Sequence, residues 1–263
     1  MRSTLHLKNQ KNPDLIFGTR AVLEAIISGK AINKVFLKNK IDNTLVRDLK
    51  KVMTEYQVFY QYVVEEKIER LAPGKNHQGV VALVSPAEYY ELDLLLPALF
   101  EAGKNPLFVI LEGITDVRNF GAIARSVATL GADAIILPLK NSVSITSDAI
   151  KTSAGALHQV KTCRVKNLLE AVIFLQNSGV QVIACSEKAN TNVNEVDFTV
   201  PTALIFGSEE DGIASEILKK SNQIAKIPFL EESGIYSLNV SAAAAIVLYE
   251  AQQQRTKNLL SAK

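Results

Sequence analysis

Short apolar runs alternate with helical segments through the second half of the chain. The runs LFVILEG, ADAIILP, VQVIACS and TALIFGS begin at residues 107, 132, 180 and 202. The helical segments NFGAIARSVATLG and NLLEAVIFLQNSG end at Gly131 and Gly179. Runs that are apolar throughout are typical of strands buried on both faces. Their alternation with helices predicts an α/β domain with a parallel sheet covered by helices on both sides.

The first 85 residues form a second, smaller pattern. Three strand-like runs, INKVFLKN, VFYQYV and HQGVVALVS, accompany the helical segments AVLEAII and TLVRDLKKVMTEY. Prolines and a glycine then interrupt residues 86–105 around a short helical stretch, which is typical of a connector. We therefore predict a small α/β domain at 1–85, a linker at 86–105 and the parallel-sheet domain at 106–263.

Charge is distributed unevenly between these parts. Residues 1–85 carry 14 Lys and Arg against 8 Asp and Glu, and the other 178 residues carry 15 against 19, which gives the net charge of +2. A basic first domain favours contact with a polyanion such as RNA. A solvated basic face explains the same count, so charge alone leaves both interpretations open.

Neither a membrane nor a metal is expected. No apolar run approaches the roughly 20 residues that span a bilayer, and the start MRSTLHLKNQKNPD lacks the apolar segment of a secretory signal. We expect a cytoplasmic protein. The chain holds 2 Cys and 3 His without the spacing of a zinc site or disulfide framework, so we predict two buried thiols and no metal.

Ligands of parallel sheets bind at the carboxyl ends of the strands, where Gly113, Gly207 and Pro228 fall. The chain has no G-x-G-x-x-G and no Walker A sequence. The turn at Gly207 instead reads GSEEDG. Phosphate-binding turns offer backbone N–H groups and usually a lysine, so three consecutive acids make a nucleotide phosphate a poor ligand here.

Three polar clusters lie near these strand ends, and each has a plain structural interpretation. Asn119 can cap the helix that carries Arg125. The acids of the GSEEDG turn can complement the dipole of a following helix. The segment SLNVS, residues 237–241, can open a buried helix whose alanines allow close packing.

Together, the three clusters resemble the motifs of the SpoU, or TrmH, family of SPOUT RNA methyltransferases. The family motif N-x-G-A-I-x-R matches Asn119 to Arg125, and G-[SN]-E-x-x-G matches Gly207 to Gly212. An I-P pair followed by S-L-N-V-S matches 227–228 and 237–241, and SAGALHQV at 153–160 is similar to the family's connector. Such enzymes transfer a methyl group from S-adenosylmethionine to a ribose 2′-hydroxyl.

The resemblance implies further features of fold and substrate. It implies a C-terminal trefoil knot and a homodimer, although chains in general do not thread loops. Residues 1–85 are similar to the substrate-binding module of the ribosomal-RNA branch, exemplified by the guanosine-2′-O-methyltransferase of the large-subunit (23S) RNA. Members acting on transfer RNA commonly lack that module. We therefore expect ribosomal RNA as the partner and a guanosine as the target.

Family members bind S-adenosylmethionine in a bent form through backbone groups of three loops. The resemblance implies that the cofactor contacts Phe206, Gly207, Ile227, Pro228 and Leu238. Glycine at 207 would let the backbone approach the ligand closely. A carboxylate is tolerable beside the cationic sulfonium, which explains how an acidic turn can serve a ligand without phosphate.

Catalysis requires positioning of the 2′-hydroxyl and removal of its proton. The resemblance assigns the central role to Arg125, with Asn119, Glu209, Ser237 and Asn239 orienting the ribose and ordering the loops. An arginine is a poor base because its pKa lies above about 12. Arg125 can instead clamp a phosphate and lower the pKa of the hydroxyl, and the sequence leaves both roles open.

Several alternatives remain at this point. The chain can be a transfer-RNA enzyme or an antibiotic-resistance enzyme of the same family, or an RNA-binding protein without catalysis. A Mg²⁺-dependent phosphotransferase can use Glu209, Glu210 and Asp211 as ligands, but no phosphate loop accompanies them. The sequence departs from the family pattern at two places. One is the pair of acids Glu210 and Asp211, and the other is the loop 228–237, which is about two residues longer than usual. Both affect the expected local geometry and substrate preference more than the reaction type.

Overall fold

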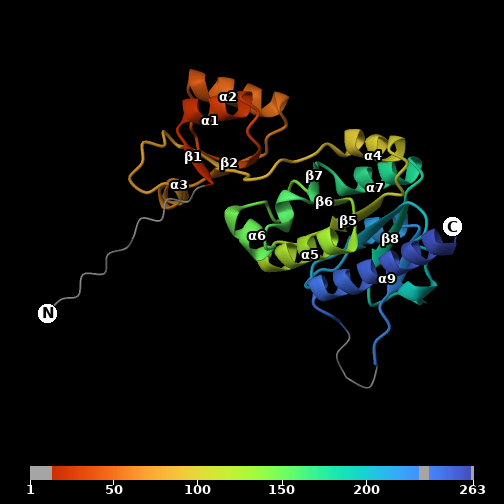
Figure 1. The fold of residues 1–263 in the computed structure, drawn as a ribbon. Coiled ribbons are helices and arrows are strands. Elements are labelled where there is room, and N and C mark those ends of the chain that lie inside the picture. Colours follow the sequence, from red (N-terminus) through yellow and green to blue (C-terminus); the bar gives the residue numbers. More distant parts are fainter. Residues whose placement is uncertain (1–13, 231–236, 262–263) are drawn as a thin grey trace. The chain divides into compact units, whose positions relative to one another are not determined.

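The computed structural model describes residues 14–230 and 237–261, apart from the side chains of 259 and 261. The chain divides into two compact units, Met1–Pro86 and Ala87–Lys263 (Figure 1). Each unit has hydrophobic clusters of its own, and these clusters do not share residues.

The first unit is a four-stranded mixed sheet with three helices. Strand β2 pairs with β3 in parallel and with β4 antiparallel, and β1 is antiparallel to β4, in the order β1-β4-β2-β3. The strands are β1 (Leu15–Phe17), β2 (Ile32–Lys38), β3 (Tyr60–Val63) and β4 (Val80–Val84). The helices are α1 (Thr19–Ile27), α2 (Thr44–Glu55) and α3 (Glu65–Leu71).

Alternation along β2 explains how the first unit is layered. Val35 and Leu37 are fully buried in a cluster that includes residues of α1 and α2, such as Val22 and Leu49. Phe36, between them, packs with a smaller cluster on the other face that contains Ile68 of α3. Successive side chains of a strand point to opposite faces, so the sheet is covered on both.

The second unit contains the predicted parallel sheet. Its seven strands are all parallel, in the order β7-β6-β5-β10-β8-β11-β9. The strands are β5 (Leu107–Leu111), β6 (Ala134–Pro138), β7 (Lys161–Val165), β8 (Gln181–Cys185), β9 (Thr191–Asn192), β10 (Thr202–Phe206) and β11 (Gln223–Lys226). The four apolar runs are β5, β6, β8 and β10, so the α/β prediction is confirmed.

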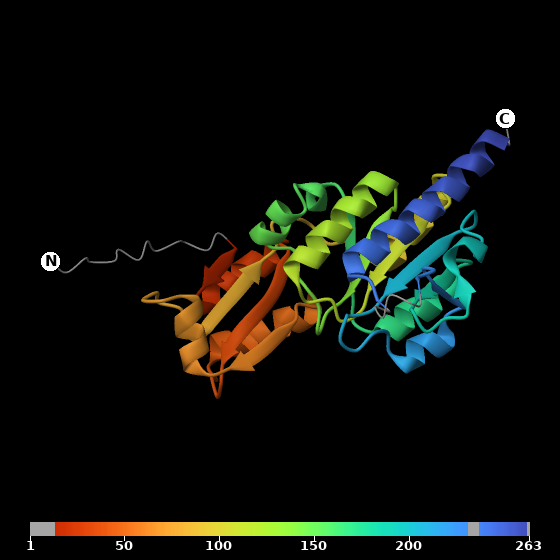
Figure 2. The same ribbon diagram turned by 90° about the horizontal axis from the view of Figure 1, so that it is seen from below.

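Helices cover both faces of this sheet. One cluster joins β5 and β10 to α5 (Val117–Leu130) and α9 (Val240–Ser261). A second cluster, on the other face, joins the sheet to α4 (Leu92–Glu101), α7 (Leu168–Asn177) and α8 (Ser215–Lys220). Figures 1 and 2 show α9 lying along α5, where the fully buried Ala244 and Ala251 belong to the shared cluster.

The segment expected to connect the two domains contributes to the core of the second unit. Helix α4 buries Leu92, Leu95, Leu96 and Leu99 in the cluster on one face of the sheet. Tyr90 also forms a parallel bridge with Cys163 of β7. The leucines at helical spacing supply an apolar face, which gives these residues a place on the sheet despite the prolines around them.

The two edge strands of the sheet were missing from the sequence-based expectation. Strand β7 carries polar residues, as in KTCRV, and β9 has only two residues. Such strands pair through backbone groups at positions that the apolar pattern does not mark.

Within the part of the chain that the structure describes, no helix is long and apolar enough to cross a bilayer.

Candidate functional site

The three sequence motifs meet at the carboxyl ends of β5 and β10. Helix α5 follows β5 and begins after Asp116, whose carboxylate accepts a hydrogen bond of 2.7 Å from the N–H of Arg118. Asp116 is therefore the N-cap, and the expected capping role of Asn119 is wrong. Asn119 lies in the first turn of the helix, which leaves its amide free to bond elsewhere.

Asn119, Glu209 and Asn239 form a hydrogen-bonded cluster, here called the amide–carboxylate cluster. The Nδ2 of Asn239 donates to Oε1 of Glu209 at 2.7 Å and to Oδ1 of Asn119 at 3.0 Å. The Nδ2 of Asn119 donates to the same Glu209 oxygen at 3.4 Å. Each motif supplies one member, so residues up to 120 positions apart in the chain converge on one point.

The beginning of α9 completes this cluster. Oδ1 of Asn239 accepts bonds from the N–H of Ser241 at 3.0 Å and from its hydroxyl at 2.6 Å. Oε1 of Glu209 accepts a longer bond of 3.4 Å from the N–H of Val240. A helix N-terminus favours a nearby negative charge, so the Glu209 carboxylate is held by two amides and by the helix.

The turn that carries Glu209 is a closed loop. The N–H of Gly212 donates to the carbonyl of Ser208 at 3.0 Å, and the N–H of Asp211 donates to the Ser208 hydroxyl at 3.0 Å. Helix α8 begins only at Ser215. The acids at 209–211 thus precede the helix by several residues, and they do not belong to its first turn.

Gly207 is required by the loop itself. A Cβ atom at this position would lie 2.2 Å from the carbonyl carbon and oxygen of Gly212. Gly121 of the first motif is similar, because a Cβ there would lie 2.7 Å from the side chain of Thr152. Both glycines allow close packing within the protein, which adds a structural reason to the close approach to a ligand expected at Gly207.

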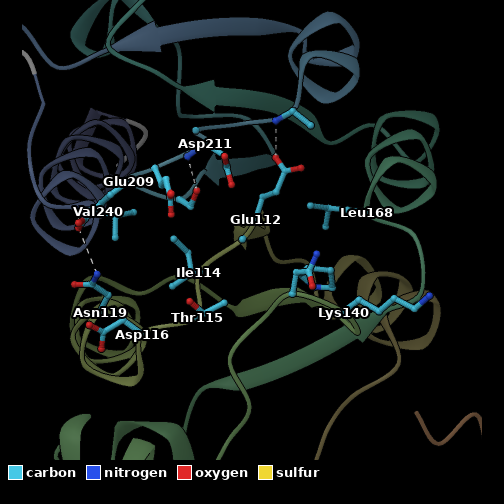
Figure 3. Close-up of a pocket in the computed structure, with 17 residues that line it drawn as sticks. Glu112, Ile114, Thr115, Asp116, Asn119, Lys140, Leu168, Glu209, Asp211 and Val240 are labelled. Carbon is cyan, nitrogen blue, oxygen red and sulfur yellow. Dashed lines mark hydrogen bonds between the residues drawn. The ribbon is translucent and has the colours of Figure 1, made fainter. Parts of the chain in front are cut away.

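A cavity of about 770 Å³ opens beside the amide–carboxylate cluster (Figure 3). This volume lies within the range of about 300–1,000 Å³ typical of ligand sites. Asn119 lines one wall and Lys140 the opposite one. Its acidic residues come from two loops and are Glu112, Asp116, Glu209, Glu210 and Asp211.

Glu112 is the carboxylate most removed from water among these acids. It follows β5, and its Oε2 accepts a hydrogen bond of 3.0 Å from the N–H of Ala214. Burial raises the pKa of Glu112 above its usual value, although the bond from Ala214 opposes this rise. In the described residues, the carboxylates of the cavity do not form a group with metal-binding geometry.

Two of the five expected catalytic residues stand apart from the amide–carboxylate cluster. Arg125 lies on the exposed side of α5, and it does not line the cavity. Ser237 is exposed and lies two residues before Asn239. The structure thus brings together Asn119, Glu209 and Asn239, and it does not bring Arg125 or Ser237 into contact with them.

The residues expected to bind the cofactor lie outside this cavity. The side chain of Phe206 is buried in the core of the sheet, so only its backbone is accessible to a ligand. Ile227 packs partly against the same core, whereas Pro228 and Leu238 are exposed. The 228–237 loop, whose extra length was noted, lies largely outside the described residues, which omit 231–236.

Three residues that line the cavity were missed by the sequence-based analysis. Glu112 and Lys140 follow the strands β5 and β6, and Asp116 caps α5. The position of each just beyond a parallel strand was the signal that could have found them, because such positions share one edge of the sheet.

Comparison with known families accounts for both units. Residues 106–249 match the model of the SpoU rRNA Methylase family. Residues 15–90 match the model described as RNA 2′-O ribose methyltransferase substrate binding. A TrmH-family tRNA/rRNA methyltransferase of Staphylococcus epidermidis is 33% identical over 241 residues, which are 92% of this chain and 96% of the relative. One from Bacillus subtilis is 30% identical over 242 residues, with the same coverage.

Solved structures share the fold. The SpoU methyltransferase AviRb from Streptomyces viridochromogenes, in complex with AdoMet, has a TM-score of 0.58 at 23% identity, covering 92% of this chain and 90% of that one. The A. aeolicus TrmH/SpoU tRNA modifying enzyme has a TM-score of 0.54 at 29% identity, covering 65% of this chain and 88% of that one. The matched segments include all three motifs that meet at the cavity, and the chain belongs to the SpoU/TrmH family of RNA methyltransferases.

Proposed function

We propose that this protein uses S-adenosylmethionine to methylate a ribose 2′-hydroxyl of ribosomal RNA. The observation that carries this proposal is the convergence of Asn119, Glu209 and Asn239 from three separate motifs beside a cavity large enough for a nucleotide. An RNA-binding protein that has lost catalysis should lack the polar residues of these motifs, and here they are intact. The proposal extends family membership to a specific cofactor, reaction and substrate.

The residues present fit the proposed cofactor. S-adenosylmethionine carries a sulfonium and an ammonium, and the 207–212 loop offers carboxylates and backbone groups rather than the lysine that a phosphate would need. Leu238 is 48% exposed and Leu230 is 68% exposed, so both offer apolar surface to a ligand. Phe206, Gly207, Ile227 and Pro228 would contribute backbone contacts. When bound, the cofactor supplies the methyl group.

The amide–carboxylate cluster would orient the ribose. Asn119 and Asn239 offer amide groups, and Glu209 offers a carboxylate oxygen that can accept a bond from a hydroxyl. Arg125 would act on the 2′-hydroxyl or on its phosphate, and Ser237 would help to order the loop before α9. Because Arg125 is exposed, it can contact bound RNA without leaving its helix. Its charge would then favour loss of the hydroxyl proton.

The first unit is the reason why we propose ribosomal RNA rather than transfer RNA as the substrate. Residues 15–90 match the substrate-binding family model. The tRNA modifying enzyme of A. aeolicus covers only 65% of the chain. A guanosine of the 23S RNA is the specific target that we propose. A transfer-RNA or antibiotic-resistance specificity is the alternative within the same family.

Three further features belong to this proposal. The order of the strands places β10 between β5 and β8, which is compatible with the C-terminal trefoil knot.

Helices α5 and α9 pack together. Ile246 and Tyr249 of α9 are 42% and 55% exposed, and they provide an apolar surface for a homodimer. We place the reaction in the cytoplasm, where free thiols such as Cys163 and Cys185 remain reduced.

The test is methyl transfer from labelled S-adenosylmethionine into RNA that lacks the modification. The purified protein is incubated with ribosomal RNA and with transfer RNA, and the methylated ribose is mapped. Label in one ribose of ribosomal RNA supports the full proposal, and label only in transfer RNA supports the alternative. Cofactor binding with no transfer into either RNA would refute the reaction.

A second experiment tests the role of the first unit. Deletion of residues 1–85 removes the basic unit and leaves the second unit with its own hydrophobic clusters. The remainder should bind S-adenosylmethionine as the full chain does, with RNA affinity reduced at least about tenfold, because the lysines and arginines of the first unit would be lost. Undiminished RNA affinity would contradict the assignment of substrate binding to this unit.

A further inference from the structure

The charge around the cavity is strongly one-sided. Of the described residues that line it, five are carboxylic acids and one, Lys140, is basic. Glu209 and Asp211 lie on one side, and Lys140 lies on the other (Figure 3). A polynucleotide carries one negative charge per nucleotide, so its backbone is repelled from the acidic side. This repulsion acts within a Debye length of about 8 Å at physiological ionic strength.

A second lysine extends the basic side of the cavity. Strands β6 and β7 are parallel neighbours in which Pro138 pairs with Val165, and the N–H of Leu139 donates to the carbonyl of Val165 at 2.9 Å. Lys140 follows Leu139 and Lys166 follows Val165. Both lysines therefore lie just beyond the carboxyl ends of neighbouring strands, with Lys166 one position out of register with Lys140.

Both lysines are available to a ligand. Each is exposed, and neither belongs to an ion pair with any residue in 14–230 or 237–261. Two lysines of the second unit are in ion pairs, Lys104 with Asp133 at 3.2 Å and Lys151 with Asp148 at 3.7 Å. The beginning of α7 lies directly after Lys166 and adds the positive end of a ten-residue helix.

We propose that Lys140 and Lys166 bind the phosphates that flank the nucleotide held in the cavity, so that the RNA backbone approaches over the β6–β7 edge. This inference rests on the proposed RNA substrate and adds the direction from which the RNA arrives. The amide–carboxylate cluster would receive the ribose on one wall, and the two lysines would hold the backbone on the other. The acidic loop at 209–211 would keep the backbone off the opposite side.

Charge reversal tests this proposal in the full-length protein. The double variant Lys140→Glu/Lys166→Glu replaces two phosphate contacts with repulsion. Its KM for RNA should rise at least about tenfold, with kcat and S-adenosylmethionine affinity unchanged. The slope of log K against log[salt] should fall by about 1.4, because each lost contact with single-stranded RNA accounts for about 0.7.

A matched control has the same change of charge before the amino end of β11, away from the cavity. Lys219 and Lys220 are exposed, adjacent lysines at the end of α8, just before β11 begins at Gln223. The variant Lys219→Glu/Lys220→Glu should leave KM within about twofold of the wild type. Equal effects of the two pairs, or an unchanged KM for the first pair in a folded protein, would overturn the proposal.

Directed cleavage of RNA tests the direction of approach without a loss of affinity. Burial raises the pKa of both native thiols, Cys163 and Cys185, to about 12, so an introduced surface cysteine reacts selectively with a tethered cleavage reagent. Reagent attached through Lys166→Cys should cut RNA within a few nucleotides of the methylated ribose, and reagent attached through Lys220→Cys should not.

The outcomes separate the two proposals. If the wild-type protein transfers no methyl group and neither reagent-bearing variant cuts RNA, the proposed function itself is contradicted. If the wild-type protein methylates RNA but only the reagent at position 220 cuts RNA near the methylated ribose, the function stands and the assigned direction is refuted.

Discussion

Asn119 of the amide–carboxylate cluster and Arg125 belong to the same sequence motif, yet they have different surroundings in the fold. Asn119, Glu209 and Asn239 bond to one another at 2.7 to 3.4 Å. Arg125, on the same helix as Asn119, is exposed and stands apart from them. Six residues further along a helix correspond to about 9 Å and a turn of about 240°. The helix thus presents the two residues on different sides.

The fold alone sets the geometry of the cluster, whereas the position of Arg125 would depend on a bound partner. The cluster is held by backbone turns, a helix N-terminus and tight glycine packing, so its geometry exists before any ligand binds. Arg125 has no such support, and its position would be fixed by RNA or by a second copy of the chain. Changes to the cluster should therefore disturb the protein itself, whereas changes to Arg125 should disturb only the reaction.

The largest effect is expected from Gly207→Val. The new Cβ would lie 2.2 Å from the backbone of Gly212, which cannot move without opening the closed 207–212 loop. We expect a loss of several kcal/mol of stability and loss of the amide–carboxylate cluster, because Glu209 is carried by this loop. Thermal melting and calorimetry with S-adenosylmethionine measure the two losses.

Gly212→Ala is the matched control for this change. Nothing lies within 4 Å of a Cβ at Gly212, but its φ of 69° strains any other residue. A cost of about 1 kcal/mol is therefore expected, smaller than that of Gly207→Val. If Gly207→Val kept the melting temperature and lost only cofactor binding, the glycine would serve the ligand rather than the loop.

Arg125→Ala should have the next largest effect, on catalysis alone. We expect methyl transfer to fall by at least about 10²-fold, the usual loss for an electrostatic or proton-transfer group, with unchanged cofactor affinity and melting temperature. Single-turnover transfer into ribosomal RNA, normalised to folded protein, measures it. Arg125→Lys then separates charge from geometry, because lysine lacks the planar fork for bidentate phosphate contact.

Arg118→Ala provides the comparison on the same helix. Arg118 is paired with Asp116 at 3.0 Å and its side chain is 86% exposed. Its loss should change transfer by less than about threefold. Near-normal turnover of Arg125→Ala would remove Arg125 from the catalytic residues and leave the cluster as the whole site.

The sequence predicted the central strands and the members of the cluster, but not the edge strands or the hydrogen bonds that join the cluster. Apolar runs such as TALIFGS mark strands buried on both faces, so β5, β6, β8 and β10 were predictable. The edge strand β7, KTCRV, carries polar residues and gave no such signal. Asn119 was expected to cap α5, but Asp116 has that role. A polar residue near a helix start can serve either purpose, and only the fold shows which partner it reaches.

The sequence predicted a ligand site at the strand ends near Gly113 and Gly207, but not all of the residues that line the cavity. Glu112 and Lys140 line it because β5 and β6 are neighbours in the sheet, and strand order does not follow from the apolar pattern. Gly207 was recognisable as a motif residue, but its contact with Gly212 depends on the closed shape of a single loop. Long-range neighbours and tight turns are therefore what the structure adds.

Asn239→Asp should have a moderate effect that depends on pH. The Nδ2 of Asn239 lies 2.7 Å from Oε1 of Glu209, so the variant places two carboxylates in contact. One of them must hold a proton, which raises its pKa in the folded state. Stability is then lost as pH rises towards that raised pKa. The melting temperature should lie several degrees below the wild type at pH 8, and closer to it at pH 5.

A surface pair offers the control for this variant. Asn167 donates from Nδ2 to Oε1 of Glu170 at 3.1 Å, and it caps α7 through its Oδ1. Asp caps helices as well as Asn, and these exposed side chains can separate. Asn167→Asp should thus shift the melting temperature by less than about 2 °C at either pH. Equal shifts for the two variants would show that the cluster is no more constrained than the surface.

The smallest effect is expected from Glu112→Gln. This variant tests whether the Glu112 carboxylate stabilises the cavity as the hydrogen bonds of Glu209 stabilise the cluster. Burial raises the pKa of Glu112, so the folded protein favours the protonated form, and ionisation costs stability as pH rises through the raised value. Gln stays neutral and keeps an oxygen that can accept from the N–H of Ala214. The variant should therefore match the wild type at pH 4 and melt slightly higher, by at most about 2 °C, at pH 8. Thermal melting across this range measures the difference. A variant that melts lower at pH 8 would show that the charge of Glu112 stabilises the 207–212 loop, and the rigid support of the cluster would then extend across the cavity floor.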